Sequence, residues 1–186
     1  MEKLKQRTAG DKNWPVACSH ATIGEANTEL DLNGAHLSYG DFEEATFQAK
    51  GAIKLNGAGL AHADLSGSEF TAEGYDGEID FTRANLTSAD LSGSEFTAEG
   101  YDDATISFAE ANLASADLSG LKITADSHYG DATISFAKAN LASADLSGLK
   151  ITADSNFGDA TITFAETNLD NAGTSGSTLT ADIVIG

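Results

Sequence analysis

The sequence is poor in the residues that cross-link, kink or anchor a chain. It holds one cysteine, one proline and one tryptophan in 186 residues, and aromatic residues make up 8%. Cys18 alone allows no internal disulfide, and the spacing of Cys and His fits no metal site. No apolar run approaches the roughly 18 residues of a membrane span. Basic residues are also scarce, and the net charge of −19 argues against direct binding to nucleic acid or to an anionic membrane.

Signals for targeting and for catalysis are equally weak. The start, MEKLKQRTAGDKN, has basic residues but no apolar segment after them, so it does not read as a secretory signal. If Met1 is the native start, we expect a cytoplasmic protein. The four histidines, at positions 20, 36, 62 and 128, follow no repeat and belong to no recognisable triad. We therefore expect neither an enzyme nor a bound cofactor.

The sequence consists of internal repeats. ANLASADLSG occurs at 111–120 and again at 139–148, with ANLTSADLSG at 84–93, so that leucine returns every fifth residue. Cut into fives with an apolar residue at each centre, the chain from residue 30 gives six units of four pentads. An insertion follows the fourth pentad at the same point each time, and it lengthens from three to eight residues along the chain.

A period of five fits one side of a square coil. Ile134, Phe136, Leu141 and Leu146 are spaced by two and five, which would scatter them around a helix. The first and third residues of a pentad point the same way in a short strand. Four pentads, turning at each junction, close one coil, and successive coils stack about 4.8 Å apart. The sequence therefore predicts an all-β solenoid of about six coils, with a loop inserted at one corner of each.

The run A(N/D)Lxx, tiled more than twenty times, resembles the pentapeptide-repeat proteins over roughly residues 16–181. The resemblance implies a right-handed quadrilateral parallel β-helix with four flat sides and a narrow core. Residues 1–15 are expected to form an N-terminal cap, with Trp14 over the first layer. Residues 182–186 are expected to form a strand-like tail.

Polar ladders are expected on the outside of this solenoid. An acidic ladder occupies the second position of the third pentad: Asp41, Asp64, Asp90, Asp117 and Asp145. An asparagine ladder and a threonine rank occupy the second and fourth sides. Short polar side chains bond neighbouring backbone groups at turns, so we interpret the Asp and Asn ladders as structural. Regular threonines leave ice binding as a minor alternative, although charged residues share that side.

The corner insertions are the stronger functional candidates, because loops on a rigid scaffold often carry function. They bring an aromatic residue to equivalent positions in four units, among many carboxylates. The candidate partner-binding residues are Tyr75, Asp76, Tyr101, Asp102, Asp103, Tyr129, Asp131, Phe157 and Asp159. The alternative is that the rings only stack on one another and support the loops. Clustered oxygens in DSNFGD leave calcium binding as a further alternative, although the glycine and bidentate Glu of a known calcium loop are missing.

Two classes of function follow. Members of the resembled family that protect DNA gyrase from quinolone drugs are acidic rods of duplex width. Residues 30–186 carry the whole net charge of −19, since the four acidic and four basic residues before them cancel. Six coils span about 29 Å, which gives one net charge per ~1.5 Å against one per ~1.7 Å in duplex DNA. A DNA mimic that binds gyrase is therefore one hypothesis.

The other class is a non-enzymatic scaffold that displays the corner loops to a protein partner or to another copy of itself. We prefer this hypothesis, because the regular insertions are the feature peculiar to this chain. The C-terminal run DIVIG, with Ile183 and Ile185 pointing one way, ends the solenoid in an unpaired strand edge. We expect a homodimer through this last coil, and head-to-tail stacking into a fibre is the alternative.

Overall fold

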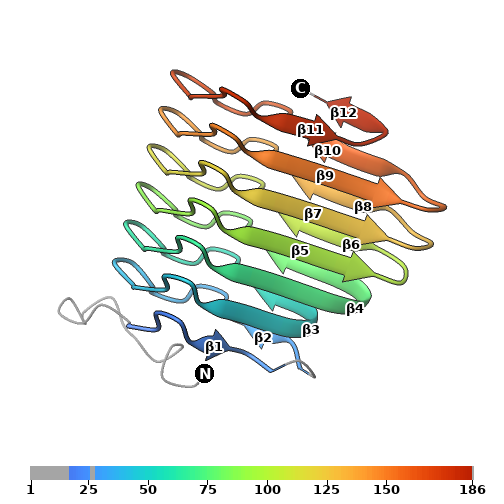
Figure 1. The fold of residues 1–186 in the computed structure, drawn as a ribbon, viewed down its shortest axis with the longest axis horizontal. Coiled ribbons are helices and arrows are strands. Elements are labelled where there is room, and N and C mark those ends of the chain that lie inside the picture. The colour runs from blue at the N-terminus through green and yellow to red at the C-terminus, as the bar shows by residue number, and fades with distance from the viewer. Residues whose placement is uncertain (1–16, 26–27, 186) are drawn as a thin grey trace.

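The computed structural model describes residues 17–25 and 28–185, and this part of the chain is made of strands and turns without a helix (Figure 1). The strands are β1 (Thr22–Ile23), β2 (Leu30–Asp31), β3 (Thr46–Lys54), β4 (Glu69–Asp80), β5 (Glu95–Gly100), β6 (Ala104–Ser107), β7 (Lys122–Ser127), β8 (Ala132–Ser135), β9 (Lys150–Ser155), β10 (Ala160–Thr163), β11 (Thr178–Thr180) and β12 (Ile183–Ile185). Coils stack from the N-terminal to the C-terminal end of the molecule (Figure 1). The all-β solenoid of about six coils that the sequence predicts is confirmed.

Parallel pairing between coils follows the repeat. On the fourth side, Phe70 of β4 lies opposite Phe96 of β5, and Phe96 lies opposite Ile123 of β7. On the first side, Ile79, Ile106 and Ile134 align in the same way through β4, β6 and β8. Equivalent pentad positions therefore form straight files along the axis.

The second and third sides are held by single bridges between coils. Asn85 pairs with Asn112, and Asp90 pairs with Asp117. The pentads here are too short for regular strands, because each turns after a few residues. The fifth pentad position provides that turn: Ser115 has φ of 57° and Gly93 has φ of 66°. This left-handed conformation suits glycine, which explains why glycine recurs at the corner.

The core is a narrow column filled from all four sides. Leu86, Leu113 and Leu141 are fully buried on the second side, as predicted. Phenylalanines stack on the first side: the ring centroids of Phe81, Phe108 and Phe136 are each 5.0 Å from the next. Buried alanines at the first pentad position let opposite sides approach. Leucine and phenylalanine therefore recur at intervals set by the coil and not by a helix or a long strand.

Two expectations concern the N-terminal end. Residues 1–15, expected as a cap, lie outside the described residues, and so does Trp14. Cys18, at the centre of its pentad, is half-buried and packs against the core. Its pentad belongs to the first described layer, so it has a described neighbouring layer on one side only. Burial still raises the pKa of the Cys18 thiol.

Candidate functional site

The acidic ladder on the third side is engaged in turn structure. Each carboxylate accepts a hydrogen bond from a backbone N–H two residues later. These N–H to Oδ1 distances run from 2.8 Å for Ser119 to Asp117 up to 3.3 Å for Glu43 to Asp41. The same bond lowers the pKa of Asp145. The contacts that the structural interpretation expected are therefore present at Asp41, Asp64, Asp90, Asp117 and Asp145.

The asparagine ladder links the coils to one another. Asn140 Nδ2 donates to Asn112 Oδ1 at 3.1 Å, and Asn168 Nδ2 donates to Asn140 Oδ1 at 3.2 Å. Their Oδ1 atoms also accept backbone N–H groups two residues later, at Ala114, Ala142 and Asp170. These contacts engage the asparagine side chains within the solenoid, both along the axis and at the turn.

The corner insertions lie together along one edge of the rod, which we call the loop edge and define as residues 73–78, 99–105, 126–133 and 154–161 (Figure 1). Much of each insertion is strand and not loop, which the sequence did not predict. β4 runs unbroken through the first of the four, and in the next coil β5 and β6 leave only residues 101–103 between them. Alanines 98 and 104 are both buried beside this turn. These small inward side chains thus let β5 and β6 extend into the insertion from either side of the corner.

The turns at the tip of the loop edge are tied to each other by backbone hydrogen bonds. Tyr101 N–H donates to the carbonyl of Gly74, and Tyr129 N–H donates to the carbonyl of Tyr101. A Cβ on Gly158 would collide with the carbonyl oxygen of Gly130, so glycine is required for this stacking. The Ser127 hydroxyl is buried and lies within hydrogen-bonding distance of the carbonyls of Asp102 and Gly130, to either of which it can donate. The tips therefore form a rigid stack.

Four aromatic rings form an exposed ladder on these tips. The exposed fractions are 65% for Tyr75, 55% for Tyr101, 49% for Tyr129 and 72% for Phe157. Successive ring centroids lie 5.9, 4.9 and 5.4 Å apart. The rings are in contact from coil to coil, which is the stacking that the alternative interpretation describes, and each keeps about half or more of its surface exposed to solvent. The ladder is an unusual concentration of exposed aromatic surface on an otherwise polar rod.

The aspartates at the tip differ in what they contact. Asp103 and Asp131 each accept a backbone N–H from the next coil, at 2.8 and 3.0 Å, and Asp76 accepts one at 3.4 Å. These contacts hold the stack together. Asp102 faces the Tyr75 hydroxyl, and its charge is the main cause of a raised Tyr75 pKa. Asp159, in the last of these tips, is exposed.

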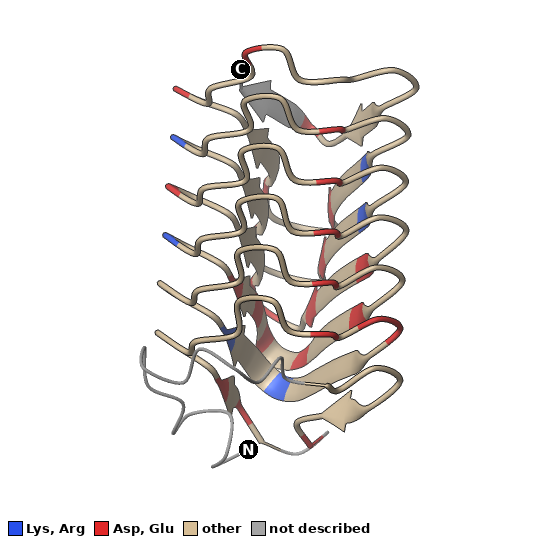
Figure 2. Cartoon of the chain, turned by 90° about the vertical axis from the view of Figure 1, so that its left-hand side faces the viewer, with Lys and Arg blue, Asp and Glu red and all other residues tan. Residues whose placement is uncertain are grey.

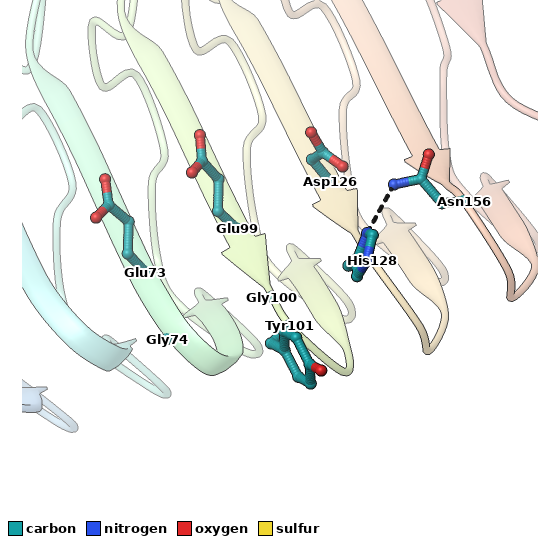
Figure 3. Close-up of a pocket in the computed structure, with 8 residues that line it drawn as sticks. All are labelled: Glu73, Gly74, Glu99, Gly100, Tyr101, Asp126, His128 and Asn156. Carbon is teal, nitrogen blue, oxygen red and sulfur yellow. Dashed lines mark hydrogen bonds between the residues drawn. The ribbon is translucent and has the colours of Figure 1, made fainter.

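A row of carboxylates beside the rings was not singled out by the sequence analysis. We call it the carboxylate row: Glu73, Glu99, Asp126 and Asp154, which are in register through β4, β5, β7 and β9 and are all exposed. Figure 3 shows the first three projecting side by side from successive strands. The signal in the sequence was the strand alternation Glu95, Thr97, Glu99, which continues the outward face into the insertion.

An open groove of about 380 Å³ lies along this row. Its other lining residues are Gly74, Gly100, Tyr101, His128 and Asn156. Asn156 Nδ2 and His128 Nδ1 are 3.1 Å apart and hydrogen-bonded, which joins the two most C-terminal of the coils that line the groove (Figure 3). The groove therefore combines three carboxylates with an aromatic ring and an imidazole on a rigid wall.

The threonine rank lies between this row and a row of mixed charge. Thr71, Thr97 and Thr124 are in register on the fourth side. Two residues before them, Glu95 and Lys122 form an ion pair with 3.7 Å between Oε2 and Nζ. A second hydroxyl rank, missed in the sequence analysis, runs along the first side at Thr105, Thr133 and Thr161.

Charged residues form rows along the stack (Figure 2). Within the described residues, no group of three His, Cys, Asp or Glu side chains could hold a metal ion. No helix in that part of the chain is long and apolar enough to cross a membrane.

At the C-terminal end, the backbone of β12 pairs with β10 in parallel, with Ile183 opposite Thr161 and Ile185 opposite Thr163. Residues 183–185 of this run are thus part of the sheet and add a rung to the first side. Leu169 and Leu179 in the last layer are each 41% exposed. The last described layer therefore presents apolar side chains at its end.

Comparison with known proteins finds a family of repeat proteins. The family model "Pentapeptide repeats" matches in eight copies, with residues 77–98 aligned. A solved structure of HetL, a pentapeptide repeat protein involved in heterocyst differentiation regulation in the cyanobacterium Nostoc sp., is 19% identical, with 91% of this chain and 90% of that chain covered and a TM-score of 0.28. Trypsin-treated QnrB1, a plasmid-mediated fluoroquinolone resistance protein, is 16% identical, with coverages of 89% and 92% and a TM-score of 0.20. Among curated proteins the sequence matches none. Likenesses at these identities and TM-scores carry no argument about function.

Proposed function

The chain belongs to the pentapeptide-repeat proteins, and from that premise we propose that it is a non-enzymatic scaffold whose loop edge binds a protein partner. The observation that carries this proposal is the ladder of four largely exposed rings on a rigid stack of turns. Exposed aromatic surface of this kind is typical of protein interfaces, where Tyr is enriched.

Rigidity supports the same proposal. The rings are already in place, because the backbone hydrogen bonds between tips fix their spacing. A partner would bind without first ordering these turns, so less conformational entropy is lost on association. The sides without insertions differ in this respect, since their Asp and Asn side chains are occupied by hydrogen bonds within the solenoid.

The rings also contribute less to folding than buried aromatic residues. Tyr101 and Tyr129 keep about half of their surface exposed. Replacing both with Ala should therefore leave the melting temperature nearly unchanged, while a partner that uses the ladder should lose binding. A large fall in melting temperature would instead favour the interpretation in which the rings only support the turns.

Site-specific cross-linking tests the proposal directly. The photoreactive residue p-benzoylphenylalanine is placed at Phe157, on the ladder, or at Tyr39, an exposed ring on a different corner that stacks on His62 with 4.8 Å between centroids. Both proteins are irradiated in extract from the source organism. We expect a discrete protein adduct from position 157 that is absent from position 39 and that disappears when Tyr101 and Tyr129 are Ala. Identical adducts from both positions, or an adduct that persists without the rings, would contradict the proposal.

A further inference from the structure

Within the described residues, no ion pair includes a member of the carboxylate row, and the cation in register with it is Lys50 of β3, which lies opposite Glu73 at the N-terminal end of the row. Among the described residues, the ion pairs within 4.0 Å are His20–Glu44, Lys54–Glu29, Arg83–Glu110 and Lys122–Glu95. None of them includes a member of the row. The pairing of Lys122 with Glu95 also keeps that cation on the other side of the threonine rank.

The row is in addition a line of like charges at the spacing of coils. Register between β4, β5, β7 and β9 places each carboxylate beside the next one, about 4.8 Å along the axis. Like charges directly opposite on neighbouring strands repel. A cationic group placed along the row would relieve this repulsion at every coil.

Aromatic and polar groups complete the recognition surface. Tyr101 lines the groove, and the Tyr101 and Tyr129 centroids are 4.9 Å apart. The face of an aromatic ring attracts Lys and, more often, Arg side chains. His128 and Asn156 are held in place by their mutual hydrogen bond and add polar groups to the wall.

We propose that the groove beside the carboxylate row takes a Lys- or Arg-rich extended segment of the protein partner, lying along the rod with its cations on the row and against the tyrosines. This inference rests on the proposed function and names the chemistry of the partner. Three of the four carboxylates line the groove, and at two coil spacings they cover about 10 Å, which is the length of about three residues of extended chain. The groove is therefore matched to a short basic segment.

The probe is a blocked pentapeptide of five lysines, with a pentapeptide of five glutamates as the negative comparison. Binding is measured by isothermal titration at about 0.15 M salt, where charges more than about 8 Å apart are largely screened. The test variant is Glu99→Gln with Asp126→Asn. The control variant is Glu43→Gln with Glu166→Gln, which changes the net charge equally but alters exposed carboxylates on other parts of the coil.

We expect the test variant to bind the lysine peptide roughly tenfold more weakly than the wild type, because two exposed ion pairs are removed. The control variant should bind nearly as the wild type does. Tyr101→Leu, which keeps bulk but removes the ring, should weaken binding several-fold. The glutamate peptide should show no binding.

Equal losses in the test and control variants would overturn the inference, because they would show attraction to the overall charge. Unchanged binding in the test variant would overturn it as well. The proposed function is judged separately by the cross-linking at Phe157. An adduct there without lysine-peptide binding would leave the loop edge as an interface for a partner of different chemistry. If neither an adduct nor lysine-peptide binding is found, the loop edge is not an interface and both proposals are wrong.

Discussion

Replacing Leu113 by alanine tests the central file of the solenoid. Leu113 is fully buried between Leu86 and Leu141, which are also fully buried. The backbone around it is fixed at the spacing of coils, since Leu113 N–H donates to the carbonyl of Asn140 at 2.7 Å and Leu86 N–H donates to that of Asn112 at 2.7 Å. The neighbouring layers therefore cannot close over a missing side chain without breaking these bonds.

The expected loss has two parts. Leucine to alanine removes about three methylene equivalents, worth about 2.4 kcal/mol of transfer free energy at ~0.8 kcal/mol each. The cavity that remains adds a further cost, and buried Leu→Ala changes span about 2.7–5.0 kcal/mol in total. Because the layers are rigid, we expect Leu113→Ala to lower the free energy of unfolding by about 3–5 kcal/mol.

Leu169 provides the matched control, since it occupies the same file in the last layer and is 41% exposed. Scaling the transfer term by its buried fraction gives a loss of about 1.4 kcal/mol for Leu169→Ala, without an enclosed cavity. Urea denaturation followed by circular dichroism measures both values. Equal losses at the two positions, or a loss below about 1.5 kcal/mol at Leu113, would refute the reasoning.

Three further outcomes are expected. Burial and the nearby Asp80 raise the pKa of the Glu78 carboxyl. Its contribution to stability is therefore present below its unfolded pKa and is lost as pH rises through the folded pKa. Glu78→Gln should raise the melting temperature near pH 7 and change it little near pH 3. Full-length protein should be a homodimer through the last coil, where Leu179 is exposed, and deletion of 182–186 should give monomers or aggregates by light scattering; a full-length monomer at high concentration would contradict this. In a gyrase supercoiling assay we expect no effect, because Lys122 and Lys150 interrupt the charge of the fourth side; inhibition at stoichiometric protein would favour the DNA-mimic hypothesis instead.

The candidate site was only partly predictable from the sequence. The repeat located the insertions and aligned Tyr75, Tyr101, Tyr129 and Phe157, because equivalent positions in successive coils must lie beside each other. The sequence did not separate the aspartates by role. Asp131 is committed to a backbone N–H of the next coil, 28 residues later, and that contact depends on how the turns settle on one another.

The sequence by itself determined the coil. The five-residue period and the pairing of first and third positions are local, and they fix which side chains point inward before any long-range contact forms. Tertiary structure alone decided that the insertions continue as strands past the corner, which depends on Ala98 and Ala104 being buried beside the turn. It also decided that Glu99 and Asp126 stand in a row without ion pairs to other described residues, while Asp90 and Asp117 are bound by turns. Both groups are acids at regular intervals in the sequence, and only the stacking of coils distinguishes them, because it sets which backbone groups come within hydrogen-bonding distance.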